Sequence, residues 1–155
     1  MQVTFSKLAL PKTGALVLGV LDKQKLLGAG VELDRKLDGL LATAMKASRF
    51  TGKAHQTLVV FSHQGRIVLY GLGDGSDINE KWCEDAGGKV AALLSNSGEK
   101  TVSVMFERSE GSEEGIDLRA AHFGYGALLR AYRFDKYKTK IKANHKPTLA
   151  TVKIL

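Results

Sequence analysis

The stretch TLVVFSHQGRIVLYGLG, residues 57–73, determines the expected architecture of this chain. It holds two runs rich in β-branched and aromatic residues, Thr57–Phe61 and Arg66–Tyr70, joined by the short segment Ser62–Gly65. Runs of this composition are typical of strands, and a four-residue connection is short enough for a hairpin loop. We therefore expect two neighbouring antiparallel strands in the middle of the chain.

Strand and helix patterns alternate on both sides of this hairpin. Alternating or continuous apolar residues predict four further strands, at 3–5, 15–20, 101–106 and 148–155. Apolar residues at helical spacing predict three helices, at 33–45, 78–94 and 116–132. One hairpin within this alternation fits a mixed β-sheet flanked by helices on both faces, an α/β sandwich of three layers.

Three details of these helices depend on a few residues. The helix over residues 33–45 is expected to be continuous, with Asp34 in its first turn. Ser76 or Asp77 is expected to cap the next helix. The pair Gly87-Gly88 costs on the order of 1 kcal/mol per glycine in a helix interior. We therefore expect the helix backbone to pack closely against the sheet at that point.

The composition is that of one globular domain, which we assign to residues 1–155. Of the 155 residues 44% are apolar and 25% charged, so neither disorder nor a fibrous repeat is indicated. The single cysteine, Cys83, excludes an internal disulfide and fits a cytoplasmic location. The sequence shows no export signal and no apolar run long enough for a membrane span. Because its last residues form an apolar strand, we expect the chain to be part of a longer protein.

Nearly the whole net charge of +7 lies in one segment, residues 130–146. This segment contains seven basic residues and one acid, and aromatic residues stand between the charges. Such interleaving suits nucleic acid, whereas a charge run that follows a helix is more often a solvated connection. The candidate nucleic-acid-binding residues are Arg130, Arg133, Lys136, Lys138, Lys140 and Lys142.

Other patterns give no catalytic, cofactor-binding or metal site. The loop Gly71–Gly75 lies between a strand and a helix, where a phosphate can bind. It lacks the third glycine of GxGxxG and carries Asp74, so a tight turn with positive φ angles is the favoured interpretation. The four histidines are scattered without ligand spacing, and Ser62-His63 is expected to be part of a turn.

Two further groups of residues are assigned structural roles. The acids of the loop 107–114 are expected to be solvated and receive no chemistry. Aromatic residues at helical spacing are expected to belong to the core rather than to a stacking platform. These aromatic residues are Trp82, Phe123, Tyr125 and Tyr132.

The sequence GALLRAYRFDKYK, residues 126–138, resembles the GxxLxxYxFxxYK pattern that closes the last helix of the N-terminal domain in the leucyl aminopeptidase (peptidase M17) family. The strand VLYGLG, residues 68–73, and the order of the elements are also similar to that domain. The resemblance covers essentially the whole chain and implies a macro-domain-like fold. The family's NTDxEGRL signature belongs to the catalytic domain and does not occur in this sequence.

The resemblance implies a non-catalytic accessory domain of a cytoplasmic leucyl aminopeptidase. The parent protein would release N-terminal amino acids, preferentially leucine, by two-metal hydrolysis with zinc or manganese in its catalytic domain. This chain itself would hold no metal or cofactor and have no activity. Its expected partners are its own catalytic domain and the other subunits of a homo-hexamer, without membrane contact. Two alternatives stay open: DNA binding through residues 130–146, and a nucleotide or ADP-ribose site at Gly71–Gly75 by analogy with macro domains.

Overall fold

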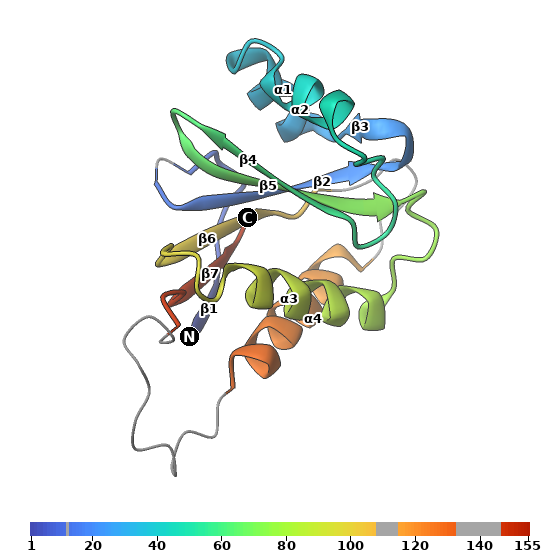
Figure 1. Ribbon diagram of the computed structural model, residues 1–155. Helices are drawn as coiled ribbons and strands as arrows, with labels where there is room; N and C mark the ends of the chain where they lie inside the picture. Colours follow the sequence, from blue (N-terminus) through green and yellow to red (C-terminus); the bar gives the residue numbers. More distant parts are fainter. Residues whose placement is uncertain (12, 108–114, 133–146) are drawn as a thin grey trace.

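The computed structural model describes residues 1–11, 13–107, 115–132 and 147–155. These residues form a seven-stranded sheet in the order β1-β7-β6-β2-β5-β4, with the short β3 beside β2. The strands are β1 Gln2–Phe5, β2 Ala15–Leu21, β3 Lys25–Leu26, β4 Thr57–Ser62, β5 Gly65–Gly73, β6 Thr101–Met105 and β7 Thr151–Ile154. The helices are α1 Gly28–Lys36, α2 Leu40–Ala47, α3 Glu80–Leu94 and α4 Ile116–Ala131, with a 3-10 turn at Asp22–Gln24. Helices lie on both faces of the sheet (Figure 1), which confirms the predicted sandwich.

The sheet is mixed in the way that the hairpin predicts. β4 and β5 pair antiparallel, with Ser62 opposite Gly65 and a two-residue turn between them. The neighbours β5, β2, β6, β7 and β1 all pair parallel. In Figure 1 the arrowheads of β2 and β5 therefore point to the same side of the molecule. The carboxyl ends of the central strands meet at one edge of the sheet.

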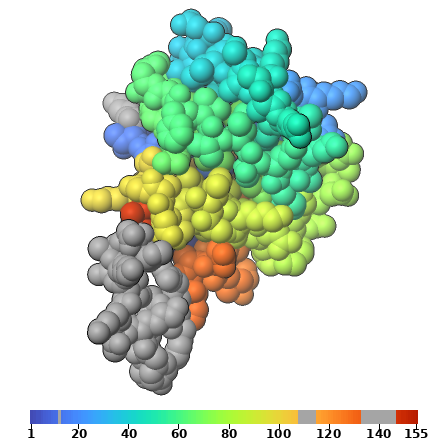
Figure 2. Space-filling model, viewed as in Figure 1, coloured from blue at the N-terminus to red at the C-terminus, as the bar shows by residue number. Residues whose placement is uncertain are grey.

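Strand β2 is buried on both faces because it lies in the middle of the sheet. Val17 joins the core beneath α3 and α4, whereas Leu16 and Leu18 join the core beneath α1 and α2. This alternation is the period of two that a strand imposes on its side chains. Figure 2 shows the outside of the same arrangement, with the cyan segment of α1 and α2 and the orange α4 at opposite ends of the molecule.

The continuous helix predicted over residues 33–45 is wrong, because the chain forms two helices there. Asp38 and Gly39 separate α1 from α2 and adopt positive φ angles of 53° and 76°. The carboxylate of Asp34 accepts hydrogen bonds from the backbone N–H groups of Leu41, at 2.7 Å, and Ala42, at 3.3 Å. Asp34 therefore accepts two backbone N–H groups that would otherwise lack partners at the start of α2. It does not stand in the first turn of one long helix.

The two glycine-containing helices α3 and α4 pack directly on each other. A Cβ at Gly87 would overlap the carbonyl oxygen of Phe123, and a Cβ at Gly126 would overlap that of Glu84. The expectation that the small residues of α3 allow packing against the sheet is therefore wrong, because Gly87 meets α4. The predicted cap at Ser76 or Asp77 is also wrong: α3 begins later, after Asn79, whose side chain accepts the N–H of Trp82 at 2.9 Å.

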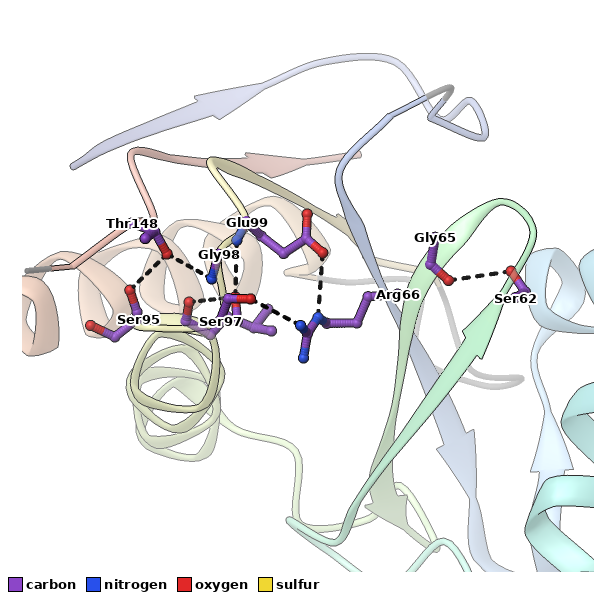
Figure 3. A network of polar contacts seen from close by, with 9 residues as sticks. Ser62, Gly65, Arg66, Ser95, Ser97, Gly98, Glu99 and Thr148 are labelled. Carbon is purple, nitrogen blue, oxygen red and sulfur yellow. Dashed lines mark hydrogen bonds and ion pairs between the residues drawn. The ribbon is translucent and has the colours of Figure 1, made fainter. Parts of the chain in front are cut away.

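A polar network ties the amino-terminal ends of the strands together (Figure 3). Arg66, at the start of β5, donates to the carboxylate of Glu99 at 3.3 Å and to the carbonyl oxygen of Ser97 at 2.9 Å. Thr148 accepts the N–H of Gly98 at 3.0 Å and donates to the carbonyl oxygen of Ser95 at 3.2 Å. The turn between α3 and β6 is thus held by β5 on one side and by the chain that leads into β7 on the other.

Candidate functional site

A pocket of about 60 Å³ opens at the carboxyl ends of three neighbouring parallel strands, β5, β2 and β6. β2 contributes Gly19, β5 contributes Leu72, and β6 contributes Met105, its last residue. Phe106 and Glu107, which follow β6, also line the pocket. The starts of α3 and α4 add Trp82 and Arg119 to its walls. Ligands of open α/β sheets bind outside the carboxyl ends of the strands. This pocket is therefore the candidate functional site of the domain.

Glu107 reaches from the end of β6 to the first turn of α1. Its Oε1 accepts a hydrogen bond of 2.8 Å from the backbone N–H of Ala29, and the helix has no side-chain cap of its own at Leu27. A Cβ at Gly28 would stand 3.2 Å from this oxygen, so glycine leaves room for the carboxylate. A negative group is favoured at a helix N-terminus by the unpaired N–H groups and the helix dipole. The place that an external anion would take is therefore held by the protein's own side chain.

The position of Glu107 corrects the expectation that the acids of residues 107–114 are all solvated. Glu107 is partly buried and bonded to α1, while residues 108–114 lie outside the described residues. The sequence did contain a signal that Glu107 could belong to a site. The residue directly follows a predicted strand, and such positions lie at the edge of an α/β sheet where ligands bind. Its partner, 78 residues away, could not be identified in that way.

Trp82 is held at the pocket by an aromatic cluster. Its indole stacks on the imidazole of His55, with ring centres 4.7 Å apart, and meets the ring of Tyr70 edge-on at 6.0 Å. His55 Nδ1 and the Tyr70 hydroxyl share a hydrogen bond of 2.7 Å. Burial, with a smaller contribution from Lys89, lowers the pKa of His55, and burial raises the pKa of Tyr70. Both neighbours are therefore uncharged at neutral pH, and the cluster fixes the orientation of the indole.

Two buried side-chain atoms at this pocket have no hydrogen-bond partner. They are the indole Nε1 of Trp82, a donor, and Oε2 of Glu107, an acceptor. Across the described ranges no other buried side-chain nitrogen or oxygen lacks a partner. An unpaired buried polar atom costs roughly 1–3 kcal/mol, so each instance calls for a physical explanation. A water or a small molecule that offers an acceptor to Trp82 and a donor to Glu107 would satisfy both atoms.

The turn predicted at Gly71–Gly75 is shorter than expected, because Gly71–Gly73 end strand β5 and the turn begins at Asp74. Gly73 and Gly75 have positive φ angles of 69° and 88°. The carboxylate of Asp74 accepts hydrogen bonds from Ser76, at 2.9 Å from the backbone N–H and 2.6 Å from the hydroxyl. These bonds hold a negative charge at the turn. Together with the carboxylate at the start of α1, the turn gives no support to a phosphate or ADP-ribose site.

Two of the three described histidines, His55 and His122, contact neighbouring side chains. His55 belongs to the aromatic cluster, His63 lies in the β4–β5 turn, and His122 Nδ1 lies 2.7 Å from Glu84 Oε1 between α4 and α3. His145 lies outside the described residues. Within the described residues no three His, Cys, Asp or Glu side chains gather in a way that could hold a metal ion. In those same ranges, no helix has the length and hydropathy needed to cross a membrane.

Of the six candidate nucleic-acid-binding residues, the structure describes only Arg130. It is exposed in the last turn of α4. The other five lie outside the described residues: Arg133, Lys136, Lys138, Lys140 and Lys142. The nucleic-acid interface therefore stays a prediction from the sequence.

Helix α4 and its C-cap residue Tyr132 carry an exposed apolar stripe, formed by Leu118, Tyr125, Leu129 and Tyr132, which we call the α4 stripe. The predicted core positions of Tyr125 and Tyr132 are wrong, since their exposed fractions are 53% and 76%. Leu118 and Leu129 are exposed by about half, and the spacing of the four places them on one side of a helix. The predicted core position of Phe123 is correct. The helix has a second apolar side, and α3 and the sheet cover only the first.

Comparison with known sequences identifies similar proteins over almost the whole chain. A family model described as "Cytosol aminopeptidase family, N-terminal domain" matches residues 17–141. A "Probable cytosol aminopeptidase" of Rhizobium meliloti (strain 1021) is 38% identical over 161 residues, and one of Chelativorans sp. (strain BNC1) is 34% identical over 149. These alignments cover 97% and 92% of this chain but 31% and 28% of the relatives. The chain thus spans about three tenths of the length of these curated relatives.

Comparison with solved structures gives the same fold. A tomato leucine aminopeptidase mutant superposes with a TM-score of 0.83 at 24% identity, over 100% of this chain and 32% of that one. The macrodomain of Thermus aquaticus DarG superposes with a TM-score of 0.67 at 11% identity, over 99% and 97% of the two chains. At these identities the likeness concerns the fold alone. It confirms the macro-domain-like sandwich.

Proposed function

The chain belongs to the cytosol aminopeptidase family, as a form of its N-terminal domain, and from this premise we propose that it is the non-catalytic accessory domain of a cytoplasmic leucyl aminopeptidase. The parent protein would release N-terminal amino acids, preferentially leucine, from peptides. The names of the relatives support an aminopeptidase, and their greater length supports a separate catalytic domain. In this proposal the domain helps to build a homo-hexamer and restricts access to the catalytic sites.

The catalytic metals, two zinc or manganese ions in this proposal, would belong to the catalytic domain. A metal-activated water requires several ligand side chains around each ion, and the described part of this chain offers no group of three. These residues therefore do not fit the metals. We expect the purified 155-residue chain to release no leucine from a chromogenic leucine amide with added Zn²⁺ or Mn²⁺. Metal-dependent release would contradict the accessory role.

The α4 stripe is the observation that carries the accessory role. Isolated globular domains rarely expose contiguous large apolar side chains, and such surfaces usually contact another protein. The buried side of α4 is already occupied, because Gly126 packs on α3 and Phe123 lies in the core. We assign the stripe to contact with the catalytic domain of the same parent protein.

A chimera tests this assignment. The 155-residue chain would replace the matching N-terminal part of the Rhizobium meliloti relative. We expect the chimera to assemble to the size of the relative in light scattering, and Tyr125→Glu with Leu129→Glu to abolish that assembly. Val31→Glu is the matched control, because Val31 is equally exposed, at 56%, but lies on α1 across the sheet. Equal assembly of the stripe variant and the control would contradict the assignment.

A second candidate function is DNA binding, which the charge of residues 130–146 favours. Each phosphate contact made by Lys or Arg adds about one unit to the dependence of affinity on salt. We expect retardation of duplex DNA in a gel-shift titration at low salt, less at high salt, and its loss after charge reversal at Lys136, Lys138 and Lys140. Absence of retardation at low salt, or retardation unchanged by the charge reversal, would remove this candidate.

A further inference from the structure

We infer that the pocket at the carboxyl ends of β5, β2 and β6 binds a free α-amino acid with a small apolar side chain. Three polar groups at this pocket carry the inference. They are Oε2 of Glu107 and the indole N–H of Trp82, both without a partner, and the guanidinium of Arg119. A carboxylate accepts, whereas an indole and a guanidinium donate. A ligand that satisfies all three must therefore combine donors and acceptors in one small molecule.

Glu107 sets the requirement for a positive group on the ligand. Glu107 lines the pocket. Its Oε1 is occupied by the N–H of Ala29, and its Oε2 is buried without a partner. An ammonium group would bind this oxygen through a charge-assisted hydrogen bond, which is about twice as strong as a neutral one. The same carboxylate disfavours ligands that are anionic throughout. This chemistry separates the pocket from a phosphate site.

Trp82 and Arg119 set the requirement for a negative acceptor on the same ligand. The guanidinium has five N–H donors, so it can bind a ligand as well as its neighbours in the protein. A ligand carboxylate can accept hydrogen bonds from both side chains. An ammonium and a carboxylate in one small molecule describe the zwitterion of a free α-amino acid.

The walls and the size of the pocket limit the side chain of the ligand. Most of the lining is apolar, with Leu27, Leu72, Ile78 and Ile116 among its members. A water needs about 10–15 Å³ on a comparable measure, so the volume of about 60 Å³ corresponds to about four to six water-sized groups. Alanine and valine fit this limit better than aromatic amino acids. The apolar part of the wall disfavours polar side chains on the ligand, because a buried polar group without a partner is costly.

Apolar amino acids are also the class of product that the proposed parent enzyme would release. The accessory domain would then sense the product of its own catalytic domain. This relation rests on the proposed function, whereas binding of the amino acid to the domain does not.

The single tryptophan of the chain gives a direct measure of binding, since Trp82 lines the pocket. The purified 155-residue chain would be titrated with L-alanine and L-valine while Trp82 fluorescence is recorded. Isobutylamine and propionate each carry one of the two charged groups and serve as half-ligands. We expect a saturable change with the amino acids, at concentrations at least about tenfold below those needed for either half-ligand.

Two matched glutamate variants locate the effect. Glu107→Gln keeps an acceptor for Ala29 but removes the charge, so we expect affinity for the amino acid to fall at least about tenfold. Glu99→Gln is the control, because Glu99 is a partly buried glutamate at the opposite end of β6 and lines no part of this pocket. We expect it to bind as the unchanged chain does. Thermal melts of both variants would verify that each is folded before titration.

Three results would overturn the inference. The first is the absence of a saturable change with either amino acid up to about 20 mM, a concentration that would saturate a site with a Kd near 1 mM. The second is propionate binding as tightly as alanine. The third is equal affinity in the two glutamate variants. An active parent enzyme whose domain binds no amino acid would refute this inference and leave the proposed function in place. Amino-acid binding by the domain of a parent without aminopeptidase activity would refute the proposed function instead.

Discussion

The two edges of the same sheet use polar side chains in opposite ways. At the amino-terminal edge, Arg66 binds both Glu99 and the carbonyl oxygen of Ser97, so charge and hydrogen bonds are used within the protein (Figure 3). At the carboxyl-terminal edge, Trp82 and Glu107 each leave one buried polar atom without a partner. The first arrangement stabilises the scaffold, and the second leaves hydrogen-bonding capacity for a ligand. In parallel α/β sheets the carboxyl edge is also where ligands bind.

This difference predicts different costs for substitutions at the two edges. Removing a group whose bonds are all made within the protein should reduce stability. Removing a buried atom that has no partner breaks no hydrogen bond, so it should not reduce stability, whereas binding should be lost. The free energy of unfolding, measured by urea denaturation, and the fluorescence titration of Trp82 together separate the two cases.

The largest expected effect comes from the backbone that supports the carboxyl-edge cluster. A Cβ at Gly71 would overlap the carbonyl oxygen of Lys53, and Gly71 also bonds the segment that carries His55, through the His55 N–H at 2.9 Å. Gly71→Ala must displace that segment, so we expect a loss of about 3 kcal/mol in the free energy of unfolding. Gly88→Ala is the control, since its Cβ would stand 3.6 Å from the nearest atom, the carbonyl oxygen of Gly126.

The Gly88→Ala control should be neutral or stabilising by roughly 0.5–1 kcal/mol, because alanine is the better helix residue. If Gly71→Ala changed stability no more than this control, the carboxyl edge would be less tightly built than its geometry indicates. Trp82 would then not be held as rigidly as the contacts around His55 indicate.

A smaller effect is expected from the amino-terminal edge. Arg66→Ala removes the bonds to Glu99 and Ser97 and leaves a partly buried carboxylate without its cation. We expect a loss of about 1–2 kcal/mol in urea denaturation and unchanged amino-acid binding. Lys81→Ala is the control: its ion pair with Asp85 is exposed, so no measurable loss is expected. A change in binding with Arg66→Ala would show that the two edges are not independent.

The sequence predicts most of the fold because apolar spacing reports burial. The buried strand β2 follows from a continuous apolar run. The hairpin of β4 and β5 and the burial of Leu33, Leu41 and Met45 follow from the spacing of apolar residues. The break at Asp38 and Gly39 does not follow, because the apolar period continues across it and only the local positive φ angles end the helix.

The candidate site is less predictable because its contacts join distant segments. The hydrogen bond between Glu107 and Ala29 spans 78 positions, and an acid in a polar loop looks solvated until the fold is known. Trp82 stands at helical spacing among apolar residues, which correctly indicates packing but not the free indole N–H. For the same reason, spacing shows that α4 is apolar on two sides but not which side is covered.

A third prediction concerns Trp82 itself. Trp82→Phe keeps an aromatic ring for stacking on His55 and removes the unpartnered N–H. Removal of the unpaired donor favours folding and loss of the larger ring disfavours it, so we expect the free energy of unfolding to stay within about 1 kcal/mol of the unchanged chain. Amino-acid binding, followed by calorimetry because the fluorophore is gone, should weaken. Binding as tight as that of the unchanged chain would show that the indole N–H does not contact the ligand.

The smallest expected effect is the pH dependence contributed by His55. Burial lowers the pKa of His55 below its ordinary value of 6.5, so the unfolded chain takes up the proton at a higher pH than the folded chain. Stability from this group is therefore present above about pH 6.5 and is lost as the pH falls through the lowered folded pKa. His55→Asn tolerates the positive φ of 63° and removes this titration. We expect the variant to lose less stability than the unchanged chain between about pH 7.5 and about pH 5.5, in parallel urea titrations. Equal losses would mean that His55 becomes protonated without disturbing its contacts with Trp82 and Tyr70. The aromatic cluster at the carboxyl edge would then not depend on a neutral imidazole.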